Sequence, residues 1–232
     1  MKSLSAIITR CNQYKALSPA LIKATNMQLL KGYRFWKWFA ENQSSYLHLD
    51  DMAHDEVEYL LNQLLQQLHQ YCDHLVFQIG GAQNAKKELI ISAEGNADYF
   101  GTVEELVYMA PRLKRWKFIA LAPATNLVSA IEYDGMAIDP CQVWFAPIET
   151  REEPHLLGVR IYVDGFNEEE AQRYYNAVYV LLESVLGERS TALDIHFMEV
   201  TTPPADPEKE DLLLLETLPA YIEMRRTIAV MN

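Results

Sequence analysis

The sequence feature that most constrains the fold is a pattern that occurs twice. Residues 88–105 read ELIISAEGNADYFGTVEE, and residues 159–170 read VRIYVDGFNEEE. Each stretch passes from strand-like alternation through an acidic residue and a glycine into a helix start. A catalytic loop would more naturally occur once, whereas a turn of the fold serves both halves. We therefore interpret Gly95 and Gly165 as turn positions with φ > 0, each with a nearby asparagine for local hydrogen bonds.

Around these stretches the chain predicts the order strand, strand, helix, strand in each of two halves. The first half, about 74–122, has predicted strands at 74–79, 88–93 and 116–121, and its helix opens at Thr102 with Glu105 in capping-box spacing. The second half, about 141–200, has predicted strands at 142–148, 157–163 and 192–200 and a helix at 168–186. Gly187 is expected to end that helix in the αL conformation. Hairpins with returning helices predict an α+β fold, a largely antiparallel sheet with its helices on one face.

Helices flank this predicted core. The pattern predicts one helix at residues 21–43 with a break near Gly32, and a second helix that Asp50 or Asp51 caps and that ends near Cys72. We expect three segments: a basic helical arm at 1–46, the α+β core at 47–201, and an acidic linker with a C-terminal helix at 202–232. A short hairpin that turns at Asp134-Gly135 connects the two halves.

Charge is distributed unevenly along the chain. Residues 1–40 contain seven lysines and arginines and no acid, whereas the remainder carries 13 basic against 32 acidic residues, for a net charge of −12 overall. Such an acidic body repels phosphate backbones, so no nucleic-acid partner is expected, and the RLKRWK cluster at 112–117 is too short to reverse this. An organellar transit peptide is one interpretation of the basic arm. We favour the alternative that the arm packs on the acidic body.

Compartment is indicated by hydropathy and by the cysteines. No apolar run approaches the roughly 18 residues that span a bilayer, so we expect no membrane partner. The apolar stretch in MKSLSAIITR is too short for a secretory signal, so we expect none there. Cys11, Cys72 and Cys141 are odd in number and widely spaced, which argues against a disulfide framework. We expect a cytoplasmic protein.

One face of the second half is the strongest candidate for a binding site. Alternation assigns Val159, Ile161, Val163, Leu193, Ile195 and Phe197 to the core face, and it assigns Gln142, Trp144, Arg160, Tyr162, Asp164, Asp194 and His196 to the opposite face. A cation, acids, a histidine and two aromatic rings together are typical of a recognition surface, and we select Trp144, Arg160, Tyr162 and His196 as binding residues. The alternative is a solvated or helix-covered face on which Trp144 and Tyr162 are cross-strand partners.

A second candidate lies in the aromatic stretch YRFWKWF at 33–39. Trp38 falls on the charged side of this helix, one turn from Arg34. It is either a partner anchor or a ring that stacks on the arginine or packs beneath another element.

The stretch HLDDMAHDE at 48–56 raises the question of a metal site. Asp51 with His54 or Asp55 could share one helical face, but first-turn acids are explained equally by the helix dipole. No P-loop, GxGxxG, GxSxG or HExxH motif is present. We therefore predict neither a metal site nor a cofactor.

The segments FWKWFAEN, ELIISAEGN, WKFIALAP and LLESVLGE together resemble a family of uncharacterised bacterial proteins. The resemblance covers about residues 33–200. It implies a bacterial cytoplasmic setting and assigns no activity and no functional residue.

The function that these features favour is non-enzymatic binding of a basic protein partner, as an inhibitor or immunity protein does. One alternative is a small-molecule enzyme, a hydrolase in which His196 is the base and Arg160 orients an anionic substrate. Another is a homo-oligomer that forms through an exposed patch. A deep pocket holding His196, an acid and Arg160 would favour the enzyme, and a flat aromatic patch would favour the binding protein.

Overall fold

The computed structural model describes residues 19–81, 85–125, 130–148, 153 and 156–231, and within these the side chains of residues 26–228. The chain forms two units, Met1–Leu121 and Ala122–Asn232. This division falls between the two repeated halves and differs from the three segments that the sequence suggested. Each unit combines helices with its own sheet, so the predicted α+β class is confirmed.

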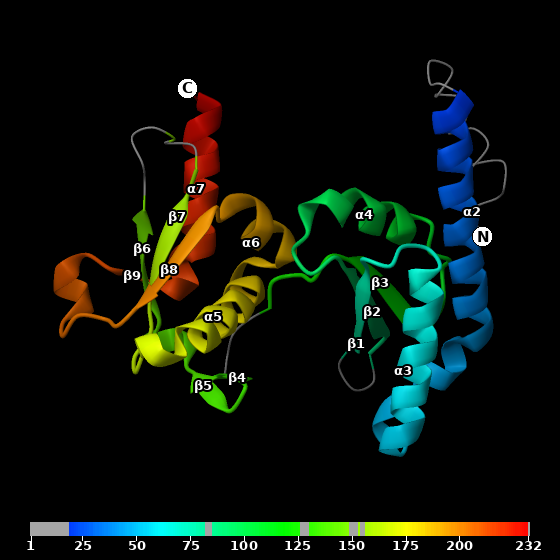
Figure 1. Ribbon diagram of the computed structural model, residues 1–232, viewed down its shortest axis with the longest axis horizontal. Coiled ribbons are helices and arrows are strands. Elements are labelled where there is room, and N and C mark those ends of the chain that lie inside the picture. Colours follow the sequence, from blue (N-terminus) through cyan, green and yellow to red (C-terminus); the bar gives the residue numbers. More distant parts are fainter. Residues whose placement is uncertain (1–18, 82–84, 126–129, 149–152, 154–155, 232) are drawn as a thin grey trace. The chain divides into compact units, whose positions relative to one another are not determined.

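The predicted order of elements occurs in both units (Figure 1). In the first unit β1 (Val76–Gly80) and β2 (Lys87–Ser92) form an antiparallel hairpin, and α4 (Phe100–Tyr108) leads to β3 (Trp116–Ala120). In the second unit β6 (Trp144–Ile148) and β7 (Gly158–Tyr162) form the hairpin, and α5 (Ala171–Leu186) and α6 (Glu188–Asp194) lead to β8 (Phe197–Thr201). A helix between β2 and β3, and between β7 and β8, allows each of these pairs to run parallel.

The strand register is also the same in the two units. Ile91 on β2 lies opposite Phe77 and Ala120. Ile161, its counterpart on β7, lies opposite Phe145 and Val200. The repeat that the sequence suggested is therefore present in the strand pairing as well as in the order of elements.

The two glycines of the repeated stretch have the predicted conformation. The φ angle is 77° at Gly95 and 75° at Gly165. The side-chain oxygens of Asn96 and Asn167 each accept a hydrogen bond from the backbone amide two residues on, at 3.2 and 3.1 Å. The repeated stretch is thus a structural turn that leads into a short 3-10 helix in each unit, η4 (Ala97–Tyr99) and η6 (Glu168–Glu170).

Helix ends in the first unit differ from the sequence prediction. Thr102 and Glu105 do not form a capping box, because α4 begins at Phe100 with Tyr99 as its N-cap. Asp50 and Asp51 lie in a 3-10 turn, η3 (Leu49–Asp51), and α3 (His54–His69) follows with Ala53 as its N-cap. Asp50 instead accepts a hydrogen bond from the Lys87 ammonium at 2.9 Å.

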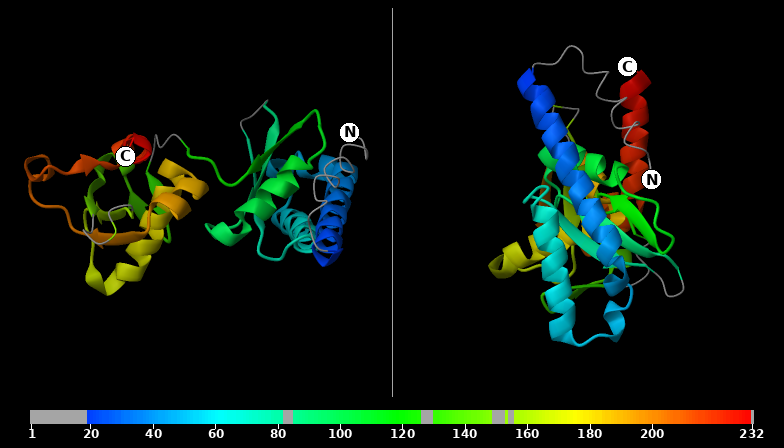
Figure 2. Two further views of the ribbon diagram at one scale, coloured as in Figure 1. Left: turned by 90° about the horizontal axis from the view of Figure 1, so that it is seen from above. Right: turned by 90° about the vertical axis from the view of Figure 1, so that its right-hand side faces the viewer.

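Helix α2 (Pro19–Asn42) runs without a break through Gly32, where the sequence predicted an interruption. A Cβ atom at Gly32 would lie 2.7 Å from Cε of Met109 and 3.3 Å from the Tyr71 ring. The glycine therefore permits close packing of the helix rather than a bend. Helix α2 lies beside α3, as two views show (Figures 1 and 2).

Aromatic side chains form the core between α2 and the first sheet. Five rings pack edge to face or stacked, and they are Phe35, Trp36 and Phe39 of α2 with Trp116 and Phe118 of β3. Phe39 is fully buried. The indole nitrogen of Trp36 donates a hydrogen bond to the main-chain oxygen of Leu106 at 2.7 Å, which connects α2 to α4.

Two buried tyrosines make this unit sensitive to alkali. Burial raises the pKa of Tyr46 and that of Tyr71 from 10 to about 12. Their hydroxyls donate to the main-chain oxygens of Leu60 and Thr102. Because both pKa values are higher in the folded chain, the stability that they contribute is complete below pH 10 and is lost as the pH rises through about 12. We expect the melting temperature to fall over this range, in step with tyrosinate absorbance.

The control for that prediction is the pair of variants Tyr46→Phe and Tyr71→Phe. Each removes one titrating hydroxyl while keeping the ring, so each should flatten the fall in melting temperature above pH 10. A melting temperature that falls equally in the wild type and in both variants would contradict the assignment.

The second unit is completed by elements from both ends of its sequence. A short hairpin, β4 (Ile131–Tyr133) and β5 (Met136–Ile138), turns at Asp134-Gly135 as predicted. Strand β9 (Leu213–Leu214) pairs with β6, which gives the sheet order β8-β7-β6-β9. Helix α7 (Leu218–Met231) and α5 pack on the sheet face that carries Phe145, Val159 and Ile161, so the core lies on that face.

The predicted closing strand at 192–200 is partly wrong. Residues 188–194 form α6, and β8 begins only at Phe197. Gly187, between α5 and α6, has the expected positive φ of 78°, but its ψ of 157° lies outside the αL region. The later start of β8 also changes which of its side chains face the core.

The first residues of the second unit are held in place by a buried carboxylate of the same unit. Glu188 is fully buried, and its side chain accepts a hydrogen bond from the Ala122 amide at 2.8 Å. The Glu188 amide donates in return to the Ala122 main-chain oxygen, also at 2.8 Å. We call this pair of hydrogen bonds the Glu188 clasp. Gly187 allows the close approach, since a Cβ atom there would lie 2.8 Å from the Ala124 nitrogen.

Candidate functional site

The strands of the second unit carry three of the predicted binding residues to one face. Val159 and Ile161 of β7 point into the core, so Arg160 and Tyr162 point to the opposite side. Trp144 on β6 lies directly opposite Tyr162 in the register. We name this side the outer face and define it by Trp144, Arg160, Tyr162, Phe197 and Glu199.

An ion pair lies at the centre of the outer face. Nε of Arg160 donates to the Glu199 carboxylate at 2.8 Å, across the parallel pair β7 and β8. Hydrogen bonds to Glu199 and then to Tyr162 raise the pKa of Arg160 above its ordinary value. The Arg160 and Glu199 side chains are 44% and 49% exposed, so the described helices leave this face open. Partner binding would desolvate the pair.

Phe197 belongs to the outer face, although the sequence assigned it to the core. Because β8 starts at Phe197, its inward residues are Met198 and Val200. The Phe197 ring lies over Gly158, where a Cβ atom would come within 2.0 Å of the ring. Gly158 was the sequence signal for this contact, because a glycine in a strand often marks a place where another group comes close to the backbone.

His196 lies beside the outer face but outside any strand. Its backbone amide donates to the Leu157 oxygen at 2.8 Å, and its Nδ1 accepts from the Leu157 amide at 3.3 Å. The imidazole is thus held at the start of β7 rather than among the outward side chains of the sheet. The prediction that alternation places it on the same face is wrong, because residue 196 precedes β8.

Two further residues are likewise absent from the predicted sheet face. Gln142 ends a 3-10 turn, η5 (Pro140–Gln142), before β6 begins. Asp194 ends α6 and forms an ion pair with Arg226 of α7 at 2.6 Å. The sequence-based prediction assigned both residues to strands, but in the structure these strands begin further along the chain.

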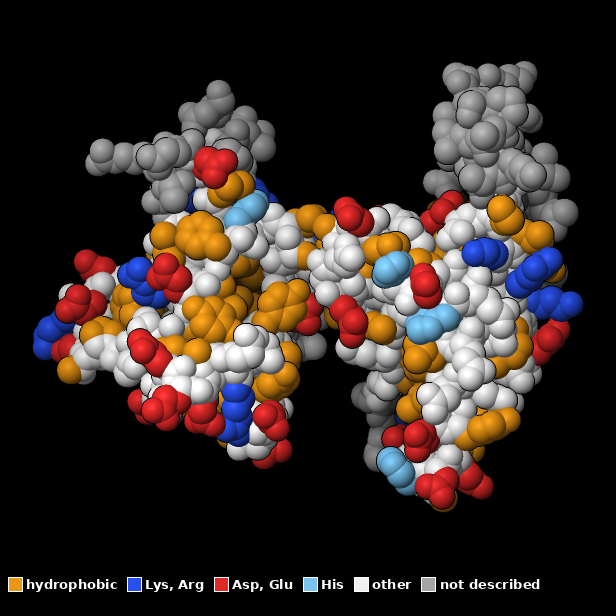
Figure 3. Space-filling view, in the orientation of Figure 1, with side chains coloured by type: hydrophobic (Ala, Val, Ile, Leu, Met, Phe, Trp, Pro, Cys, Tyr) orange, Lys and Arg blue, Asp and Glu red, His pale blue; other side chains and the backbone are white. Residues whose placement is uncertain are grey.

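The outer face belongs to the acidic part of the molecule. Residues 122–232 carry 20 acids against 7 lysines and arginines, a net charge of −13, whereas residues 1–121 carry 12 against 13. Acidic residues follow the strand ends: Asp164 comes after β7, and Asp206, Glu208, Glu210 and Asp211 come between β8 and β9. Apolar side chains reach the surface of this unit among acidic ones (Figure 3).

Trp38 belongs to the first unit, whereas the other four predicted binding residues belong to the second. Its ring is half-buried and meets the Tyr46 ring edge to face, with the centroids 6.3 Å apart. This contact matches the alternative in which the tryptophan packs beneath another element. The partner is Tyr46 of η2 (Gln43–Tyr46).

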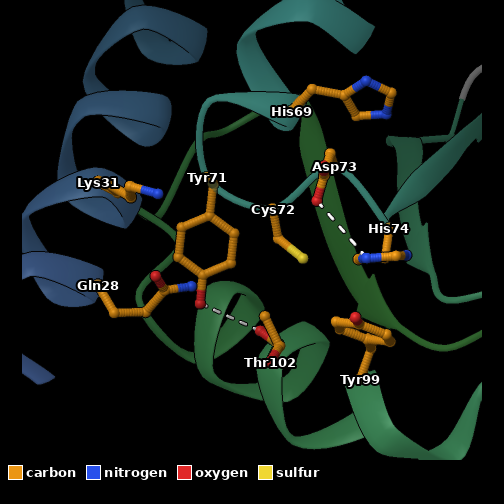
Figure 4. A pocket seen from close by; sticks show the side chains of 9 residues that line it. All are labelled: Gln28, Lys31, His69, Tyr71, Cys72, Asp73, His74, Tyr99 and Thr102. Carbon is orange, nitrogen blue, oxygen red and sulfur yellow. Dashed lines mark hydrogen bonds and ion pairs between the residues drawn. The ribbon is translucent and has the colours of Figure 1, made fainter. Parts of the chain in front are cut away.

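A cavity of about 490 Å³ lies in the first unit, at the junction of α2, the end of α3 and the start of α4 (Figure 4). Its lining is Gln28, Lys31, His69, Tyr71, Cys72, Asp73, His74, Tyr99 and Thr102. His74 stacks on Tyr99 with the centroids 4.2 Å apart and lies 3.8 Å from Asp73. None of the five predicted binding residues lines this cavity.

Metal ligands do not cluster in the described part of the chain: no three His, Cys, Asp or Glu side chains there converge on one point. In the 48–56 stretch, His48 lies 3.8 Å from Asp51, and His54 is exposed. Among the described residues, no helix is both long and apolar enough to cross a bilayer.

Comparison of the chain with protein-family models, with curated proteins and with solved structures finds no match. The resemblance to bacterial proteins therefore stays a prediction.

Proposed function

We propose that the protein binds a basic protein partner through the outer face of the second unit, without catalysing a reaction. The observation that carries this proposal is a sheet face with an exposed ion pair and three partly exposed aromatic rings, on a unit of net charge −13. Aromatic rings are the residue types that dominate binding energy at interfaces, and a polar rim surrounds them in typical interfaces.

Charge adds a preference for the sign of the partner. A net charge of −13 attracts basic surfaces and speeds their encounter at low ionic strength. The Arg160–Glu199 pair is internally neutral, so it leaves this preference unchanged while offering hydrogen bonds at the centre of the face.

The hydrolase alternative has less support. Arg160 is already paired with Glu199, and Nδ1 of His196 already accepts a hydrogen bond from Leu157. The cavity described above involves neither residue. A cytoplasmic setting remains part of the proposal, and the free thiols of Cys72 and Cys141 are consistent with it.

The test of the proposal is the double variant Arg160→Ala/Tyr162→Ala of the full chain. The probe is a fluorescent helical peptide of leucine and lysine, with affinity measured by anisotropy at about 50 mM and about 500 mM salt. We expect the double variant to lose at least about tenfold in affinity, because the loss of the Tyr162 ring, a central aromatic anchor, outweighs the extra negative charge that the loss of Arg160 leaves on the face.

The matched control is Tyr179→Ala/Arg189→Ala, which removes the same residue types from α5 and α6. It should bind the peptide as the wild type does. Equal affinity of the wild type and the Arg160→Ala/Tyr162→Ala variant, with both folded by circular dichroism, would refute the proposal.

A further inference from the structure

The exposed side of α2 combines apolar and basic side chains. Met27, Leu30 and Tyr33 are 55%, 49% and 47% exposed. Their spacing of three residues places them on one side of the helix, away from the buried Phe35 and Phe39.

The same side of α2 carries positive charge. Lys31, Arg34 and Lys37 are exposed among these apolar residues, and residues 19–40 contain no acid. Basic side chains gather along the described part of α2 (Figure 3). We name this surface the basic stripe and define it by Met27, Leu30, Lys31, Tyr33, Arg34 and Lys37. Methionine, leucine and tyrosine exposed together on one helix are typical of a helix that binds a partner.

The outer face has the complementary composition. Its aromatic rings match the apolar part of the basic stripe, and the net charge of −13 on its unit matches the three cations. Two surfaces that bind each other commonly combine opposite charge with an apolar contact region. Both surfaces are present in equal number in any solution of this chain.

We propose that the basic stripe of one copy binds the outer face of a second copy, so that the chain self-associates head to tail. This inference rests on the proposed function, since it names the basic partner of that same face. The contact is heterologous: each copy offers one basic stripe and one outer face, so association continues to a ring or an open chain of copies.

The first measurement is sedimentation velocity of the full chain from about 1 to about 200 μM. At about 50 mM salt we expect the mass to rise above the 26.7 kDa of one chain as concentration increases. At about 500 mM salt it should return to that of one chain, because the cations lie in solvent where salt screens them.

Two variants separate the two sides of the contact. Lys31→Glu/Arg34→Glu alters the basic stripe, and Arg160→Ala/Tyr162→Ala alters the outer face. Each alone should sediment as a single chain at every concentration. An equimolar mixture should form a dimer and stop there, because one intact stripe meets one intact face. The control Arg112→Glu/Lys114→Glu reverses two exposed charges elsewhere in the first unit and should associate like the wild type.

The outcomes distinguish this inference from the proposed function. A wild-type chain that stays monomeric up to about 200 μM, yet binds the leucine–lysine peptide through Tyr162, overturns self-association and leaves the proposed function standing. Association that persists in either single-sided variant, or a mixture that forms no dimer, also overturns the head-to-tail contact. If the wild type binds neither the peptide nor a second copy, both proposals fail.

Discussion

Replacement of Phe39 by alanine should lower the free energy of unfolding of the first unit by about 3 to 5 kcal/mol. Phe39 is fully buried and contacts the rings of Phe35, Trp36, Trp116 and Phe118. Its removal leaves a cavity lined by rigid rings, which cannot close without losing their own contacts. Chemical denaturation followed by circular dichroism measures the change.

The neighbouring residue provides the matched control for Phe39→Ala. Trp38 is half-buried and has one described ring contact, with Tyr46. Trp38→Ala should therefore cost clearly less stability than Phe39→Ala, although it removes a larger side chain. A greater loss for Trp38→Ala than for Phe39→Ala would mean that the assignment of the core side of α2 is wrong.

Replacement of Glu188 by alanine should lower the free energy of unfolding of the second unit by about 3 kcal/mol. The variant leaves the Ala122 amide without the carboxylate that accepts its hydrogen bond, and it opens a cavity where a fully buried side chain was. We also expect faster proteolysis in residues 122–125, because the Glu188 clasp holds that segment.

The control for Glu188→Ala is Glu208→Ala, which removes an exposed carboxylate from the same unit. Its free energy of unfolding should lie within about 0.5 kcal/mol of the wild-type value. Its proteolytic cleavage pattern should be the same as that of the wild type. Cleavage of residues 122–125 at the wild-type rate in Glu188→Ala would show that the clasp does not hold this segment.

Local sequence patterns predicted the parts of the fold that depend on local chemistry. Alternating apolar residues found both hairpins, and the acidic-glycine turns at Gly95 and Gly165 have the expected φ. The α+β class followed from the order of these elements. The same alternation placed Trp144, Arg160 and Tyr162 on one face, where the structure has them.

The errors arose where a distant contact decides the local structure. Gly32 looked like a helix break, but it makes room for the Met109 side chain, which the chain reaches 77 residues later. Residues 192–194 alternate like a strand, yet they belong to α6, because the chain turns at Gly187. Because of this error the sequence-based prediction assigned His196 to the outer face and Phe197 to the core face.

Glu188 had no signal in the sequence at all. It stands in a charged run, LGERS, which is typical of an exposed helix end. Its burial depends on Ala122, 66 residues earlier in the chain. The Ala122 amide donates to the Glu188 carboxylate the hydrogen bond that water would otherwise supply. A pattern confined to neighbouring residues cannot show this.

The position of β9 has a consequence for the order in which the chain folds during synthesis. The first unit contains every strand of its sheet by Ala120, so its core can close while later residues are still being translated. The sheet of the second unit receives its fourth strand from Leu213–Leu214, and its core includes Leu218 and Ile222 of α7. Until those residues leave the ribosome, Phe145 on β6 remains without the Tyr221 ring that packs on it. We therefore expect the second half of the chain, rather than the first, to need protection from aggregation during translation.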